Sequence, residues 1–260
     1  MTPALVVSHG APSVALEDDG YTRALATFGK RSPRTEAIIV ISAHWEARGP
    51  VHVNAVAHPG VIYDFAGFPR ELYALDYPAP GAPALAADAL RHLASDGIEA
   101  VAEMARDWDH GLWVPLRLIF PEATIPVVEV SLPVSRTPAL VFRIGEALRT
   151  LRSRGVLLIG SGGIVHNLHL LRWGDKEGPV DPWAAAFDEW VADRVERRAV
   201  EDLLAYRQRA PRADLAAPTT EHLDPLFFIL GATTEEDRTL PVFAGIHYGN
   251  LSMRTFALGS

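Results

Sequence analysis

The sequence predicts an α/β protein, a single domain in which a central, mostly parallel or mixed β-sheet is flanked by helices. Short runs rich in valine and isoleucine alternate along the chain with segments that carry apolar residues at helical spacing. The strand-like runs are almost continuously apolar, which is typical of strands covered on both faces. We find no repeat, low-complexity tract or linker in the 260 residues, so we treat 1–260 as one domain.

The expected strands are short apolar runs that end where the sequence becomes polar or takes on helical spacing. They cover 4–8, 37–43, 51–56, 98–104, 125–132, 156–160 and the long end segment 240–257. The expected helices cover 82–94, 138–154, 182–209 and 219–230. Thr219 and Thr220 suit the start of the last of these, because threonine hydroxyls cap helix N-termini. The alanine-rich, charged stretch 193–217 is interpreted as helix and loop.

Composition excludes several classes of protein. The formal net charge of −8 argues against a nucleic-acid groove, which needs a basic surface. The longest apolar runs are strand-sized and shorter than the roughly 18 residues of a membrane span. The first ten residues lack the basic start of a secretory signal, so we expect a cytoplasmic protein without nucleic-acid or membrane partners. Nothing in the sequence indicates an oligomeric state.

Five of the ten histidines occupy comparable places. His9 and His44 follow strong strand runs, and His166 follows a strand and a glycine-rich turn. His222 is expected in the first turn of a helix, and His110 lies where a polar loop enters an apolar helix. Because ligands of α/β sheets gather beyond the carboxyl ends of strands, we expect these side chains to meet at one rim.

A cluster of imidazoles is what a zinc or iron site requires. Each histidine alone has an ordinary explanation, such as capping or a half-buried polar contact. The protein has no cysteine, so any metal must be held by imidazole and carboxylate. Spacing alone does not select which three histidines bind. The other histidines, at positions 52, 58, 92, 169 and 247, are expected to play no catalytic part.

The chain resembles the class III extradiol ring-cleavage dioxygenases, in the branch of the 4,5-DOPA extradiol dioxygenases. The resemblance runs in order along nearly the whole chain and joins histidines to distinctive Trp, Gly and Pro neighbours. The matching stretches are SHGAPSVALED (8–18), VISAHW (40–45), YDFAGFPRELYALDYPAPGAP (63–83), WDHGLWVPL (108–116), GSGGIVHNL (160–168), PTTEHLDPLFFILGA (218–232) and GNLSMRTFALG (249–259).

This resemblance implies a metal site and two catalytic histidines. It assigns His9, His44 and His222 to one divalent metal, Fe(II) for ring cleavage or Zn(II) as isolated. His166 is implied as a fourth ligand or an acid–base group, and His110 as a group near the substrate oxygens. Better-known class III enzymes use two histidines and a carboxylate, so Glu221 competes with its neighbour for the third position.

The implied substrates are O₂ and a catechol, DOPA-like or a related phenolic. Trp45, Tyr63 and Phe65 are expected to wall its ring, although core packing is the competing explanation. Asp109 is expected at the substrate site, where it could also orient His110, as could Asp107.

Two other functions compete with an extradiol dioxygenase. A zinc hydrolase could use the same histidines to activate water, and a non-catalytic relative could merely hold the metal. Retention of both His110 and His166 beside the metal set favours an enzyme. The segment IGSGG lacks the spacing of a phosphate-binding loop and of a serine nucleophile elbow.

Overall fold

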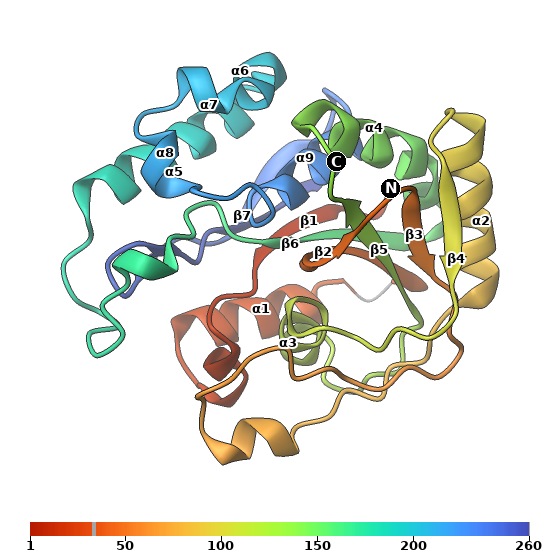
Figure 1. Ribbon diagram of the computed structural model, residues 1–260, viewed down its shortest axis with the longest axis horizontal. Helices are drawn as coiled ribbons and strands as arrows, with labels where there is room; N and C mark the ends of the chain where they lie inside the picture. The colour runs from red at the N-terminus through yellow and green to blue at the C-terminus, as the bar shows by residue number, and fades with distance from the viewer. Residues whose placement is uncertain (33–34, 260) are drawn as a thin grey trace.

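A twisted sheet of eight strands runs through the centre of the protein (Figure 1). The structure is a computed structural model that describes residues 1–32 and 35–259. The strand order is β4-β3-β5-β2-β6-β1-β10-β7. The strands are β1 (Ala4–Ser8), β2 (Ala37–Ala47), β3 (Val51–Asn54), β4 (Ala100–Glu103), β5 (Val127–Pro133), β6 (Val156–Gly162), β7 (Arg238–Phe243) and β10 (Thr255–Gly259). A separate two-stranded ribbon pairs β8 (Ile246–His247) with β9 (Leu251–Ser252).

The sheet is mixed, as predicted. Its central strands β5, β2, β6 and β1 are parallel to one another. At one side of the sheet β10 is antiparallel to both of its neighbours, β1 and β7. At the other side β3 is antiparallel to β5. Because β1, β2, β5 and β6 point the same way, the segments that follow them emerge at one edge of the sheet.

Helices cover both faces (Figure 1). One face carries η1 (Pro12–Leu16), α1 (Gly20–Lys30) and α3 (His110–Ile119). The other face packs against α2 (Pro83–Ser95), α4 (Pro138–Leu148), α9 (Asp224–Gly231) and α5 (Pro182–Glu196). The remaining short helices are η2 (Arg70–Ala74), η3 (Arg149–Arg154), η4 (Leu168–Leu170), α6 (Val200–Leu204), α7 (Tyr206–Arg209) and α8 (Ala213–Ala216).

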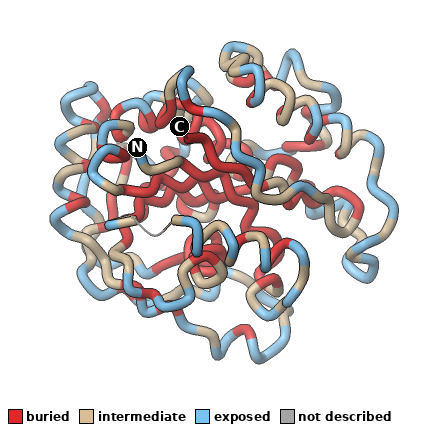
Figure 2. The backbone as a smooth tube through the Cα atoms, turned by 180° about the vertical axis from the view of Figure 1, so that it is seen from behind, coloured by how far each residue is buried: buried red, intermediate tan, exposed pale blue. Residues whose placement is uncertain are grey.

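The apolar runs of the strands are explained by this two-sided cover. Along β2, Ile38 and Val40 join the core beneath α1 and α3, whereas Ile39 and Ile41 join the core beneath α4 and α9. Buried residues therefore concentrate along the central strands (Figure 2). Successive side chains of a strand point to opposite faces, so a strand buried on both sides is apolar throughout.

Several boundaries differ from prediction. The end segment 240–257 is four strands rather than one, because the chain reverses at Tyr248 and Gly249, whose φ angles are 54° and 88°. The region 182–209 is three helices, with a break at Arg198, where φ is 55°. The final helix begins at Asp224 and not at 219. Thr220 still accepts backbone N–H groups there, but through its carbonyl.

One helix, α1, was not predicted. Its start carries a capping box, in which the Asp19 carboxylate accepts the Thr22 N–H and the Thr22 hydroxyl accepts the Asp19 N–H. Tyr21 and Leu25 lie four residues apart and are both buried. These two signals were present in the sequence. Among the described residues no helix is both long and apolar enough to cross a membrane.

Candidate metal centre

Three parallel strands deliver three of the five histidines to one edge of the sheet. His9 directly follows β1, and its N–H donates to the Gly162 carbonyl at 3.2 Å at the end of β6. His44 lies inside β2, where pairing with β5 is irregular between Ile41 and Glu46. The strand β6 continues to Gly162, so the glycine-rich stretch before His166 is strand and not a turn.

Glycines allow the other two histidines to approach the sheet. A Cβ on Gly111 would lie 2.4 Å from Ser42 Oγ and 3.0 Å from His44 Cδ2, so glycine is needed where α3 meets β2. A Cβ on Gly162 would lie 2.1 Å from the His222 carbonyl oxygen. His222 precedes α9 rather than occupying its first turn, and it is held against β6 by this close contact.

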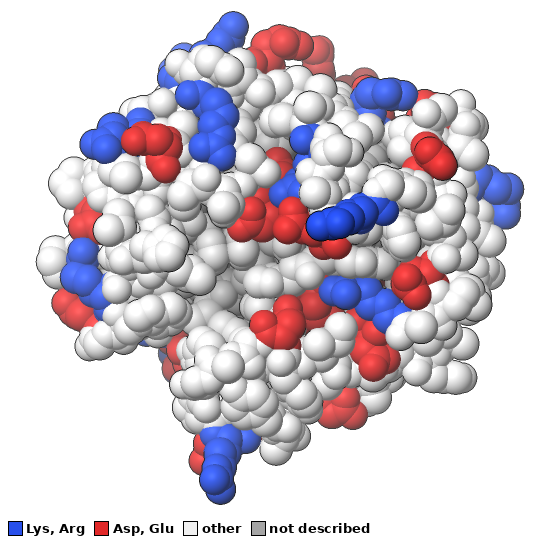
Figure 3. Space-filling view, viewed as in Figure 1, with Lys and Arg blue, Asp and Glu red and all other residues white. Residues whose placement is uncertain are grey.

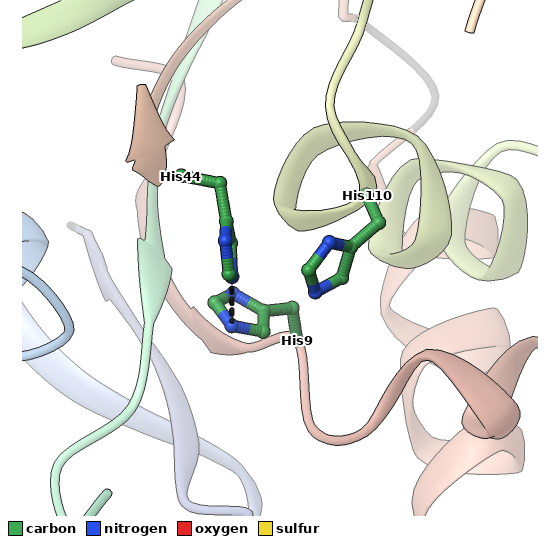
Figure 4. A group of neighbouring side chains, drawn as sticks. All are labelled: His9, His44 and His110. Atoms are coloured by element: carbon green, nitrogen blue, oxygen red, sulfur yellow. Dashed lines mark hydrogen bonds between the residues drawn. The ribbon is translucent and has the colours of Figure 1, made fainter. Parts of the chain in front are cut away.

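All five imidazoles meet at this edge. Ligand atoms of His9, His44 and His110 lie within 4.8 Å of one another (Figure 4). The His222 ring centroid lies 5.2 Å from that of His9 and 5.1 Å from that of His44. His166 stacks on His222 at 3.4 Å. The structure thus brings together every histidine that the sequence singled out.

Hydrogen bonds fix which ring nitrogen carries the proton. The Ser161 hydroxyl donates to the Gly111 carbonyl, so it can only accept from His9 Nδ1, 3.2 Å away. Asp64 accepts from His110 Nδ1 at 2.9 Å, and Glu221 accepts from His222 Nδ1 at 3.0 Å. Each of these rings therefore keeps an Nε2 lone pair.

The free nitrogens suit a metal ion. His9 Nε2 and His44 Nε2 are 3.2 Å apart, which Figure 4 marks by the dashed line. Two nitrogens bound to one zinc or iron at about 2.0–2.1 Å would be roughly 3.0–3.4 Å apart. His222 Nε2 is buried and has no hydrogen-bond partner in the described part of the chain. A buried acceptor left in this way is expected where a ligand completes the site.

Burial keeps the imidazoles of His9, His44, His166 and His222 neutral. Together with the neighbouring His110, it lowers the pKa of His44 to about 4. Burial also lowers the pKa of His166 to about 4, with a second contribution from His44. The pKa values of His9 and His222 lie well below the ordinary value for the same reasons. Neutral imidazole is the form that binds metals.

Asp64 is a site residue that the sequence analysis missed. Its Oδ1 accepts from the backbone N–H and from Nδ1 of His110, and its Oδ2 lies 3.5 Å from His44 Nδ1. The only sequence signal was its place between Tyr63 and Phe65 in a stretch already matched to the family. A loop carboxylate far from the histidines in sequence gives no periodic pattern.

Of the four predicted substrate-binding residues, Phe65 lies beside His110 and Tyr63 beside Phe65, whereas Trp45 and Asp109 are buried. Phe65 lies edge-on to the His110 ring at 5.5 Å, and Tyr63 packs against Phe65 while its hydroxyl donates to the Leu75 carbonyl. Their contact with a substrate stays a prediction. Trp113, whose ring centroid lies 6.2 Å from that of Tyr63, is fully buried in the core.

Asp109 and Trp45, both predicted to contact the substrate, are buried in this structure. Asp109 is completely buried and caps α3, accepting from Leu112 N–H, Ser42 Oγ and an Arg106 N–H. Trp45 is 6% exposed, and the Arg106 guanidinium lies over its indole ring. The distance from Arg106 Cζ to the centroid of that ring is 4.8 Å. Neighbouring strand residues point to opposite faces, so Trp45 is turned away from the site that His44 faces.

The acid Asp107, considered as a partner of His110, instead accepts the Gly60 N–H. The five remaining histidines lie outside the cluster as the structure describes it. Of these, His52 lies 3.6 Å from Glu103 on the neighbouring strand.

The fold and the cluster together define a metal-dependent enzyme site built from histidines. The family profile described as "Catalytic LigB subunit of aromatic ring-opening dioxygenase" matches residues 3–253. A protein of Escherichia coli K12 named "4,5-DOPA dioxygenase extradiol" is 41% identical, over 99% of this chain and 94% of its own. A protein of the same name from Beta vulgaris is 39% identical, over 89% of this chain and 87% of its own.

A solved structure has the same fold. It is the crystal structure of uncharacterized protein JW3007 from Escherichia coli K12, with a TM-score of 0.85, 35% identity and full coverage of both chains. The chain therefore belongs to the LigB family, and it is an extradiol ring-cleavage dioxygenase.

Proposed function

We propose that this dioxygenase opens the ring of a DOPA-like or related catechol with Fe(II) held by His9, His44 and His222. The observation that carries the proposal is the convergence of bare Nε2 atoms, including the partnerless Nε2 of His222. The names of the two relatives from Escherichia coli and Beta vulgaris support a DOPA-like substrate. Bound iron would supply the electron exchange with O₂ that side chains cannot provide.

The ligand set is chosen from two alternatives. His9, His44 and His110 form the tightest triple, but His110 projects from the helix on the side of Phe65, where an aromatic ring would bind. His222 has its Nδ1 fixed by Glu221 and its Nε2 buried. We therefore assign His222 to the metal and His110 to the substrate.

His166 is the proposed base. It is neutral at pH 7, since burial lowers its pKa to about 4, and its ring stacks on His222 beside the metal position. A neutral imidazole there can accept a catechol proton as the substrate binds. Stacking fixes the plane of the His166 ring, so its nitrogens are held in position for that transfer.

His110 is proposed to hold a proton near the substrate oxygens. Its Nδ1–H is bound to the Asp64 carboxylate, which would stabilise the imidazolium form when Nε2 takes up a proton. His110 can then return that proton to an oxygen of the opening ring. Phe65 beside it would pack against the aromatic substrate.

The test is to load metal-free protein anaerobically with Fe(II) or Zn(II) and to measure O₂ uptake with L-DOPA and a panel of catechols. Iron-dependent uptake with a new yellow absorbance supports the proposal. Firm metal binding without uptake for any catechol contradicts it and favours hydrolysis or a non-catalytic role.

Variants separate the roles. We expect His222→Ala to lose most metal affinity. His110→Ala and His166→Ala should keep the metal but lose at least about 100-fold in turnover, the usual contribution of acid–base catalysis. Loss of metal from His166→Ala would make that residue a ligand, and retention of metal by His222→Ala would refute the assigned triple.

A further inference from the structure

Asp64 stands between two imidazoles with different proposed roles. Its Oδ1 is 2.9 Å from His110 Nδ1 and 3.0 Å from the His110 backbone nitrogen. Its Oδ2 is 3.5 Å from Nδ1 of His44. The two imidazole centroids are only 4.0 Å apart. One carboxylate thus lies against both rings on the side away from their Nε2 atoms.

The segment that carries Asp64 is firmly held. The Ile62 N–H donates to the Trp108 carbonyl at 2.7 Å, and the Trp108 N–H donates to the Gly60 carbonyl at 2.9 Å. The Trp113 indole N–H donates to the Ile62 carbonyl at 3.2 Å. Residues 60–64 are therefore fixed to the start of α3, which also carries His110. The position of the Asp64 side chain is set by the fold, and the side chain is 24% exposed.

We propose that Asp64 is a positioning residue that fixes His44 and His110 together, so that a single carboxylate sets the orientation and tautomer of one metal ligand and one substrate-facing histidine. A carboxylate only accepts hydrogen bonds at neutral pH, so His110 must present Nδ1–H to Asp64. The same negative charge, 3.5 Å from His44 Nδ1, favours a proton on that nitrogen too, which leaves Nε2 of both rings for the centre. The inference rests on the proposed metal site.

Charge gives Asp64 a second effect. Three neutral histidines leave the charge of a divalent metal uncompensated, whereas a triad with a carboxylate ligand supplies one negative charge directly. Asp64 places such a charge one residue away from the metal, through His44. Carboxylates behind metal-binding histidines raise the basicity of the ligand, and their removal typically weakens metal binding about 10- to 100-fold.

The experiment compares wild type with Asp64→Asn, which keeps the size of the side chain but loses its charge and one acceptor. Asp64→Ala removes both acceptors. Asp107→Asn is the matched control, because Asp107 fastens the same segment at Gly60 without contacting an imidazole. Circular dichroism verifies that each variant is folded.

Two measurements are made on each protein. Chelator competition gives the dissociation constant for Zn(II), and NMR of the zinc-loaded protein with ¹⁵N-labelled histidine reports the protonated ring nitrogens. We expect zinc affinity to fall about 10- to 100-fold in both Asp64 variants. We also expect the exchange-protected Nδ1–H signals of two histidines to shift or disappear, with Asp107→Asn like wild type in both respects.

Unchanged zinc affinity and unchanged imidazole signals in both Asp64 variants would overturn the inference, as would equal losses in the Asp107 control. Neither measurement requires ring cleavage. A protein that binds zinc through Asp64-dependent histidines but consumes no O₂ with any catechol would therefore refute the proposed function and leave this inference standing.

Discussion

Replacing Gly111 by alanine tests whether the contact between β2 and α3 builds the metal centre. The added Cβ would lie 2.4 Å from Ser42 Oγ, 3.0 Å from His44 Cδ2 and 3.2 Å from Asp109 Oδ1. Carbon atoms in contact normally lie about 3.5–4.0 Å apart, so Ser42 must move by about 1 Å. That movement breaks the 2.7 Å hydrogen bond from Ser42 to the buried Asp109 carboxylate.

The magnitude follows from three terms. Overpacking a core costs about 1–3 kcal/mol, and losing a hydrogen bond to a charged group costs about 1.5–3 kcal/mol. Alanine in a helix recovers about 1 kcal/mol relative to glycine. The free energy of unfolding of Gly111→Ala should fall by about 1.5–5 kcal/mol, and a domain of this size loses about 2–4 °C in Tm for each kcal/mol.

Thermal unfolding and zinc titration of the metal-free protein measure the effect. Zinc affinity should also fall, because the new methyl group pushes on the His44 ring. Gly174→Ala is the control, since a Cβ there meets nothing within 4 Å. If Gly111→Ala matches this control in both Tm and zinc affinity, the close approach of α3 to β2 does not build the site.

Two further predictions concern buried charge. The pKa of both His44 and His166 is lowered to about 4 in the folded protein, against about 6.5 when unfolded. The unfolded chain therefore binds protons first as pH falls, so the stability present above about pH 6.5 is lost progressively toward pH 4. At pH 5 the loss reaches about 2 kcal/mol for each ring. Denaturant titration of metal-free protein that gave the same free energy of unfolding at about pH 7 and pH 5 would disprove this. Asp237→Ala should lower the free energy of unfolding, measured with denaturant, by about 3–5 kcal/mol, because it leaves the fully buried Arg152 guanidinium without its carboxylate. A loss below about 1 kcal/mol would mean that this ion pair is not needed for stability.

Much of the architecture could be read from local sequence. Strands buried on both faces are apolar throughout, so the run 37–43 identified β2 and the run 4–8 matched β1. The helix α1 was missed although its capping box and the spacing of Tyr21 and Leu25 were visible. The end segment was misjudged because a reversal at Tyr248 needs a left-handed backbone that no composition rule assigns to tyrosine.

For the candidate site, too, the sequence identified part of the arrangement and the folded chain decided the rest. The sequence by itself determined five histidines at the ends of elements, because polar side chains there interrupt apolar runs and are easily recognised. Only the tertiary structure decided that all five meet, because parallel strands bring residues 9, 44 and 166 to one edge while Gly111 and Gly162 admit two more.

The partners of the histidines could not be inferred in advance. Asp109, one residue before His110, was expected to meet the substrate, yet its side chain turns inward to cap α3. Asp64, 46 residues away from His110 along the chain, supplies the carboxylate instead. The side chains of adjacent residues point in different directions, so a neighbour in sequence need not be a partner in space. The contacts that orient an imidazole depend on distances between residues that only the folded chain brings together.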